Sequence, residues 1–330
     1  MSDLAIQLDD VTKRFGDHQA LRGVTFSAPV GSVLGVLGPN GAGKTTTINI
    51  LATLLRPTSG TATIAGFDVV RQARQVRESI GLTGQYAAVD ELLTGRENLI
   101  LFARLRGMDK TTARDRADEM LATFSLTDAG DKRVTTYSGG MRRRVDIACG
   151  LVVRPEVVFL DEPTTGLDPR SRQAIWDLVT TFKAAGIATL LTTQYLEEAD
   201  GLSDRIIVID RGTIVAQGTA DDLKKRTGGT VCEIVPSDPT DVFAVADALG
   251  SLLPAASRAA ITADSDRVSI PAPDGPGTLG AALSRLTAAS IDLDDIGLRK
   301  PSLDDVFLSL TGDSASEALT VPMYPTGVSR

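Results

Sequence analysis

A glycine-rich loop between a buried strand and a helix is the feature that most limits the folds open to this chain. The apolar run 32–37 predicts a buried strand, and Gly-Pro-Asn-Gly-Ala-Gly-Lys-Thr-Thr follows it at 38–46. Apolar residues then recur at Ile48, Ile50 and Leu51, where the spacing turns helical. Glycines in such a loop let backbone N–H groups face a phosphate. The sequence therefore predicts a strand, loop and helix that bind nucleotide phosphates.

The loop residues are the candidate nucleotide contacts. Lys44 supplies the charge that neutralises the β- and γ-phosphates, and the Thr45 hydroxyl is a candidate Mg²⁺ ligand. A glycine-rich turn without a ligand is the alternative, and the flanking strand and helix argue against it. The predicted contacts are Gly38, Pro39, Asn40, Gly41, Ala42, Gly43, Lys44, Thr45 and Thr46.

Two carboxylates end a second buried strand at 157–161. Asp161 can hold Mg²⁺ through water, and Glu162 can accept a proton from the water that attacks the γ-phosphate. An apolar run that ends in two acids also fits a plain strand end. Together with the phosphate loop, the acids predict a site of ATP hydrolysis.

A second helix start is suited to binding an anion. Ser138 is a candidate N-cap and is followed by Gly139 and Gly140 at the start of a helix predicted over 139–152. A chain with one phosphate loop and a second helix start of this kind suggests that two copies share the nucleotide.

Strands and helices alternate along the first two thirds of the chain, which predicts an α/β sheet flanked by helices. Apolar residues at helical spacing predict a mostly helical insertion at 96–127. Antiparallel strands are expected within 4–37, further buried strands at 187–192 and 205–210, and a helix at 171–184.

Composition shifts at 226–229, which indicates a boundary between two domains. Beyond it, the pattern predicts the order β-α-β-β-α-β, with strands at 230–235, 259–263, 266–270 and 291–298. A capping box at Ser302–Asp305 opens a further helix. We expect a nucleotide-binding domain at 1–225 with a helical subdomain at about 86–150, a small α+β domain at 226–312 and a loose tail at 313–330.

Charge and residue counts exclude several classes of function. A net charge of −8 is the wrong sign for a protein that coats nucleic acid or anionic lipid over its whole surface. Two cysteines and one histidine cannot supply a disulfide framework or a Cys/His zinc site. No apolar run reaches the roughly 18 residues of a membrane span, and no signal peptide is recognisable, so we expect a cytoplasmic protein unless a partner holds it at a membrane.

These motifs, in this order, resemble the ATP-binding cassette family over about residues 4 to 220. The resemblance implies a P-loop NTPase cassette core with an antiparallel β subdomain and a helical insertion, followed here by the small split βαβ-like domain. It also implies that Gln85 touches Mg²⁺ and the attacking water, and that the loop with Asp168 crosses a dimer next to the opposite site. Phe15 stands where the family stacks an aromatic ring on adenine, although a core phenylalanine is the alternative.

The chain departs from the family pattern after its last core strand. Gln194 stands where the family usually has a histidine. A glutamine amide can donate to a γ-phosphate oxygen, but it cannot titrate. Our hypothesis is that Gln194 senses the phosphate by position and that Glu162 is the general base.

Longer stretches resemble the daunorubicin-resistance-type exporter subunits of actinobacteria. They lie at 85–98, 192–200 and 301–312. That resemblance implies ATP and Mg²⁺ as cofactors, a second copy of the chain and a separate polytopic membrane subunit as partners, and no nucleic acid. The implied activity is export of anthracycline-like drugs or complex lipids from the cytoplasmic face of the membrane.

Two other interpretations of the function remain open from the sequence. A soluble cassette ATPase acting on a ribosome or nucleoprotein is opposed by the acidic charge and the lack of a basic tail. A subunit that binds nucleotide without turning it over requires Glu162 to be idle.

Overall fold

The computed structural model describes residues 3–84, 88–226, 229–259, 261–262, 265–300, 302–303 and 306–307. Two compact units meet in sequence at Ala220 and Asp221, within helix α8 (Ala220–Arg226). Each unit is described by itself.

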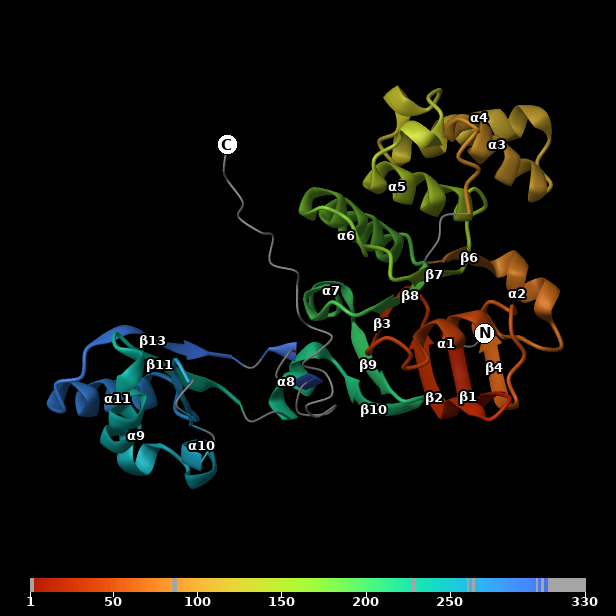
Figure 1. Cartoon of the computed structure of the whole chain (residues 1–330). Coiled ribbons are helices and arrows are strands. Elements are labelled where there is room, and N and C mark those ends of the chain that lie inside the picture. The colour runs from red at the N-terminus through yellow and green to blue at the C-terminus, as the bar shows by residue number, and fades with distance from the viewer. Residues whose placement is uncertain are drawn as a thin grey trace. The chain divides into compact units, whose positions relative to one another are not determined.

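A six-stranded sheet forms the centre of the first unit (Figure 1). Its strands are β3 (Val33–Leu37), β6 (Ile80–Thr83), β7 (Val157–Asp161), β8 (Ala188–Thr193), β9 (Arg205–Asp210) and β10 (Thr213–Gly218). They lie in the order β10-β9-β3-β8-β7-β6, and all neighbours are parallel except β10 and β9. Strands β3, β7 and β8 are buried along their whole length, as their continuous apolar runs predict.

Strand register brings the glycine loop and the acid pair to one edge of this sheet. Strand β8 lies between β3 and β7 and pairs in parallel with both. Leu37, the last residue of β3, pairs with Thr193, and Asp161, the last residue of β7, pairs with Thr192. The carboxyl ends of these parallel strands therefore share an edge, where ligands bind in open α/β sheets.

A four-stranded antiparallel sheet confirms the strands expected within 4–37. It is formed by β1 (Leu4–Phe15), β2 (His18–Pro29), β4 (Ser59–Ile64) and β5 (Phe67–Asp68), in the order β2-β1-β4-β5. Helix α1 (Lys44–Leu51) shares one apolar core with this sheet and the central sheet, through Ile48 of α1, Ile6 of β1 and Phe159 of β7.

Helices form a second apolar core in the same unit and confirm the predicted helical insertion. They are α3 (Gly95–Leu105), α4 (Lys110–Thr123), α5 (Gly139–Gly150) and α6 (Pro169–Ala184), with α2 (Ala73–Ser79) and α7 (Leu196–Leu202) elsewhere in the unit. Side-chain caps define their starts: Thr94 forms a capping box with Glu97, and Asp109, Ser138 and Asp168 each accept a backbone N–H of the first turn.

The second unit contains a three-stranded antiparallel sheet in the order β12-β11-β13. Its elements are β11 (Val231–Pro236), α9 (Val242–Leu249), α10 (Ala255–Ala259), β12 (Val268–Pro271), α11 (Pro276–Ala288) and β13 (Leu293–Arg299). Buried side chains of α9 and α11 cover this sheet, among them Val245 and Leu286.

The strand expected at 259–263 is wrong, and with it the order β-α-β-β-α-β. Ala259 ends helix α10, and the described residues Ile261 and Thr262 form no strand. Alanines and an arginine are strong helix formers, and Arg258 of this turn donates to the carboxylate of Asp247, 2.7 Å away. Helix α10 therefore reaches the first residue of the range in which a strand was expected.

At the C-terminal end, Leu303, Val306 and Phe307 are helical and buried. Asp305 of the expected capping box and the tail at 313–330 lie outside the described residues. Within the part of the chain that the structure describes, no helix combines the length and the apolar character needed to cross a membrane.

Candidate functional site

The loop between β3 and α1 requires glycine at specific positions. Gly43 precedes α1 with a φ of +111°, and a Cβ there would lie 2.7 Å from Cδ2 of Leu21. At Gly38, a Cβ would lie 2.3 Å from the carbonyl oxygen of Ile209. Only glycine fits both places, and this backbone turns the start of α1 toward the open side of the loop.

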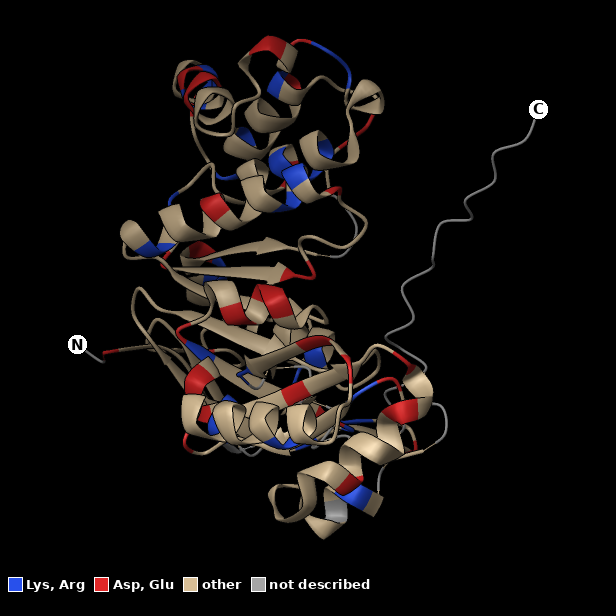
Figure 2. Cartoon of the chain, turned by 90° about the vertical axis from the view of Figure 1, so that its left-hand side faces the viewer, with Lys and Arg blue, Asp and Glu red and all other residues tan. Residues whose placement is uncertain are grey.

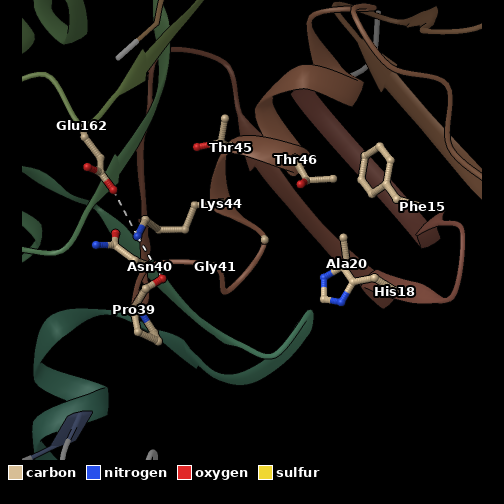
Figure 3. Close-up of a pocket in the computed structure, with 11 residues that line it drawn as sticks. Phe15, His18, Ala20, Pro39, Asn40, Gly41, Lys44, Thr45, Thr46 and Glu162 are labelled. Atoms are coloured by element: carbon tan, nitrogen blue, oxygen red, sulfur yellow. Dashed lines mark hydrogen bonds and ion pairs between the residues drawn. The ribbon is translucent and has the colours of Figure 1, made fainter. Parts of the chain in front are cut away.

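A pocket of about 260 Å³ opens over this loop (Figure 3). Phe15, at the end of β1, lines it with a side chain that is 45% exposed, so Phe15 is not a core residue. The ammonium of Lys13 lies 4.9 Å from the centre of the Phe15 ring. The residues lining the pocket are Phe15, His18, Ala20, Pro39, Asn40, Gly41, Gly43, Lys44, Thr45, Thr46 and Glu162.

Lys44 is the buried cation of the pocket. Its Nζ donates to the carbonyl oxygens of Gly38, at 2.7 Å, and Pro39, at 3.2 Å. The Glu162 carboxylate lies 3.2 Å from the same nitrogen, and both side chains are buried (Figure 3). The positive charge is thereby held at the loop, at the point where phosphate oxygens would meet it.

The two acids end β7 with different surroundings. Asp161 is buried, and its Oδ1 accepts a hydrogen bond of 2.6 Å from the Thr192 hydroxyl of β8. Glu162 has a φ of +46°, a conformation that side-chain-bearing residues adopt rarely and at a cost. Its N–H donates to the carbonyl of Thr192, 3.1 Å away, which helps to hold this backbone. The strained residue points its carboxylate at Lys44.

Ser138 caps the start of helix α5, where the sequence predicts a second anion site. The Ser138 hydroxyl accepts the N–H of Met141 at 3.3 Å, and Gly139 and Gly140 begin α5. A Cβ at Gly140 would lie 2.2 Å from Oγ of Ser171, so glycine permits α5 to approach α6. None of these residues lines the pocket of the same chain.

Asp168 caps the neighbouring helix α6. It accepts the N–H of Ser171 at 3.0 Å and its hydroxyl at 2.6 Å, and these hydrogen bonds hold the pKa of the carboxyl below its ordinary range. Asp168 and Gly140 thus contact the same serine. The predicted crossing loop and the predicted second anion site are therefore neighbours in the fold.

Gln194 follows β8 directly and is half-buried. Strand β8 also supplies Thr192, which contacts Asp161 and Glu162. Gln85 lies outside the described residues, between Gly84 after β6 and Ala88.

Sequence reasoning missed two residues. Three arginines, Arg142, Arg143 and Arg144, follow one another in α5, and Arg142 lies 3.2 Å from the carboxylate of Glu91. Arg143 is instead buried, and its guanidinium donates to backbone carbonyls beside the acid pair. An arginine three residues before Asp146 on an otherwise apolar helix face was the available signal.

His18 is the second residue that sequence reasoning undervalued. It is exposed, and it also lines the pocket over the glycine loop. Its position opposite Phe15 in the β1–β2 pairing was the available signal.

Comparison with known proteins decides the family. A family model described as ABC transporter matches residues 21–165. The chain is 61% identical over 320 residues to the doxorubicin resistance ATP-binding protein DrrA of Mycobacterium tuberculosis H37Rv, with 96% of each chain covered. The chain belongs to the ATP-binding cassette transporter family.

Other ATP-binding cassette proteins agree with this assignment. The daunorubicin/doxorubicin resistance ATP-binding protein DrrA of Streptomyces peucetius is 47% identical over 96% of this chain and 95% of its own length. Among solved structures, the dimeric post-hydrolysis cassette MJ0796 bound to ADP and Pi matches with a TM-score of 0.60 and 27% identity, over 65% of this chain and 98% of that one. The ATP-binding cassette fold and ATP hydrolysis are thus established for this chain.

The donor set at the cassette's phosphate loop fits Mg²⁺. Thr45 offers a hydroxyl at the pocket, and Asp161 offers a buried carboxylate at the same sheet edge. Oxygen ligands of this kind, few in number, are what Mg²⁺ takes beside substrate phosphates.

Proposed function

We propose that this cassette ATPase energises export through a separate polytopic membrane subunit, and that the cargo is an anthracycline-like drug or a complex lipid. The support is the set of similar proteins, several of which are doxorubicin or daunorubicin resistance ATP-binding proteins. A linearmycin resistance ATP-binding protein of Bacillus subtilis is 34% identical over 93% of this chain.

The nucleotide lies in the pocket above α1 in this proposal. Phe15 stacks on the adenine, because an exposed ring at the pocket provides a flat apolar face. Residues 38–46 hold the phosphates with backbone N–H groups, and Lys44 neutralises their charge. When phosphate oxygens bind Lys44, they replace Glu162 as its anionic partner.

Released from Lys44, Glu162 accepts the proton of the water that attacks the γ-phosphate. The Glu162 side chain is largely shielded from solvent and lies 3.2 Å from Lys44 of the phosphate loop, which suits it to this role. The side-chain amide N–H of Gln194 donates a hydrogen bond to a γ-phosphate oxygen. Gln194 thereby senses whether the γ-phosphate is bound, without changing its own protonation. Bound Mg²⁺, held by Thr45, Asp161 and Gln85, would neutralise charge that develops on the phosphates.

A second copy of the chain completes each site. Ser138, Gly139 and Gly140 of one copy bind the γ-phosphate held by Lys44 of the other, because they form an anion-binding helix start away from their own pocket. Asp168 lies beside that helix start, and its loop crosses to the opposite site. The dimer closes on ATP, reopens after hydrolysis, and drives the membrane subunit from the cytoplasmic face.

The alternative, action on a ribosome or nucleoprotein, is not favoured. The similar proteins above are resistance ATP-binding proteins, and the chain carries a net charge of −8. Figure 2 shows acidic and basic segments interspersed over the helices and loops of the described chain.

Affinity isolation tests the proposal. The Glu162→Gln variant, expected to bind ATP without hydrolysing it, is purified from gently solubilised host membranes, and the proteins bound to it are identified by mass spectrometry. The proposal expects a stoichiometric polytopic membrane protein, absent when Lys44→Ala is used as the control. Ribosomal proteins or nucleic acid in its place would refute the exporter function.

A further inference from the structure

The guanidinium of Arg143 connects helix α5 to two segments at the carboxyl edge of the central sheet. One segment follows β7, and the other follows β6. It donates from Nη2 to the carbonyl oxygen of Asp161, at 3.1 Å, and from Nε to that of Pro163, at 3.0 Å. It also donates from Nη1 to the carbonyl of Gly84 at the end of β6, at 2.6 Å. Arginine can satisfy three carbonyls at once because its planar fork carries five N–H donors.

Two of these carbonyls flank Glu162 in the chain. Glu162 itself has the unfavourable φ of +46°, and such a conformation persists only where its surroundings hold it in place. Through the Asp161 carbonyl, Arg143 holds the peptide unit that precedes Glu162, and through the Pro163 carbonyl it holds the unit between Pro163 and Thr164. Thr192 holds the Glu162 N–H from the other direction.

Arg143 is itself anchored within α5. Asp146, one turn further along, lies 3.5 Å from Nη1 of Arg143, and it accepts the N–H of Ala88 at 2.7 Å. Burial lowers the pKa of the Arg143 guanidinium and raises the pKa of the Asp146 carboxyl, while the opposite charges of the pair oppose both shifts. A buried guanidinium without an acidic partner would destabilise the fold, so the ion pair with Asp146 helps to hold the Arg143 guanidinium in place.

Ser138 caps the start of helix α5, less than two turns before Arg143. We propose that Arg143 is a positioning residue for hydrolysis: it fixes the backbone around Glu162 and ties that backbone to the helix that carries Ser138. This inference rests on the proposed role of Glu162 as general base and adds the residue that orients the Glu162 backbone. When Ser138 binds the nucleotide of the other copy, any movement of α5 is passed through Arg143 to the backbone around Glu162. The position of the Glu162 carboxylate then changes with the position of α5.

The first test is Arg143→Lys. Lysine keeps the charge but presents one compact ammonium, which cannot span the three carbonyls on two segments. We expect kcat for ATP hydrolysis to fall by at least about tenfold, as misplacement of a reacting group does. ATP affinity, KM and ATP-driven dimerisation should be unchanged, because the pocket contacts are retained.

Arg144→Lys is the matched control. Arg144 is the next residue of the same helix and also donates to backbone carbonyls, those of Phe124 and Ser125, at 2.9 and 3.2 Å. Those carbonyls follow α4, away from the acid pair. We expect Arg144→Lys to retain wild-type kcat.

A double-variant cycle separates positioning from a general loss of structure. In the Glu162→Gln background the aimed carboxylate is gone, so Arg143→Lys should not lower the residual rate further. An equal fractional loss in both backgrounds would overturn the proposal, as would a folded Arg143→Lys protein with the kcat of Arg144→Lys.

A neutral pair covers the case in which Arg143→Lys does not fold. Arg143→Met with Asp146→Asn removes both buried charges and keeps an acceptor for Ala88. The same loss of kcat is expected, and wild-type kcat would overturn the proposal. Failure of both proteins to fold would assign Arg143 a role in folding and overturn it equally. If Glu162→Gln alone retains wild-type hydrolysis, the proposed base fails instead, and the inference falls with it.

Discussion

The ammonium of Lys44 lies 3.2 Å from the carboxylate of Glu162, so the phosphate-binding cation and the proposed general base are direct partners. Both side chains are largely shielded from solvent; Lys44 begins helix α1, and Glu162 directly follows strand β7. If the triphosphate binds Lys44 as proposed, it exchanges one anionic partner of Lys44 for another. In the proposed reaction, that exchange sets Glu162 free to act as a base.

Removing the Glu162 charge should separate binding from hydrolysis. We expect Glu162→Gln to lose about 10²- to 10⁴-fold in kcat, the usual contribution of a general base. ATP should bind at least as tightly as to the wild type, because the competing carboxylate at Lys44 is neutral. Equilibrium binding of a fluorescent ATP analogue and single-turnover hydrolysis measure the two effects. Weaker binding would show that Glu162 supports the pocket instead of competing within it.

The exposed ring of Phe15 should contribute to affinity and not to chemistry. Stacking of a base on an aromatic ring is worth roughly 1–3 kcal/mol, so Phe15→Ala should weaken ATP binding by about 5- to 150-fold with kcat at saturating ATP retained. Phe243→Ala is the control, since Phe243 is an exposed phenylalanine of the second unit. Equal ATP affinity of the two variants would remove Phe15 from the site.

Two glycines should respond oppositely to alanine. Gly43→Ala places a methyl group 2.7 Å from Leu21 at a φ of +111°, and we expect lower thermal stability and loss of ATP binding. Gly280 lies exposed within α11 with open space around its Cα, so Gly280→Ala should stabilise its helix by about 1 kcal/mol. Thermal melts with and without ATP compare them. A tolerated Gly43→Ala would contradict the loop geometry.

Gln194→His should add a pH dependence to the reaction. An imidazole titrates near pH 6.5, whereas an amide does not titrate. We expect the pH profile of kcat for Gln194→His to gain an acid limb that the wild type lacks. A limb near neutral pH in the wild type, lost in Gln194→Ala, would contradict the positional role of Gln194.

The sequence predicted the parts of the site that depend on contiguous residues. The loop at 38–46, the acids after 157–161 and the cap at Ser138 each carry their chemistry within a few positions, and the α/β sheet flanked by helices follows from the alternation of strands and helices. The features that the sequence did not predict depend on contacts between residues that lie far apart in the chain. The fork of Arg143 reaches carbonyls about 20 and 60 residues away, and side-chain type alone could not indicate its burial. In the second unit, Arg258 of α10 contacts Asp247 of α9, a contact between two helices that the local pattern around 259–263 did not indicate.

Sedimentation of the Glu162→Gln protein with Mg²⁺ and either ATP or ADP tests the shared nucleotide site most directly. If Ser138 of one copy closes on the nucleotide held by Lys44 of the other, ATP should convert the protein to a dimer, ADP should leave it monomeric, and Ser138→Arg should abolish the ATP effect. A protein that stays monomeric with saturating ATP, or that dimerises equally with ADP, would contradict a site completed by a second copy.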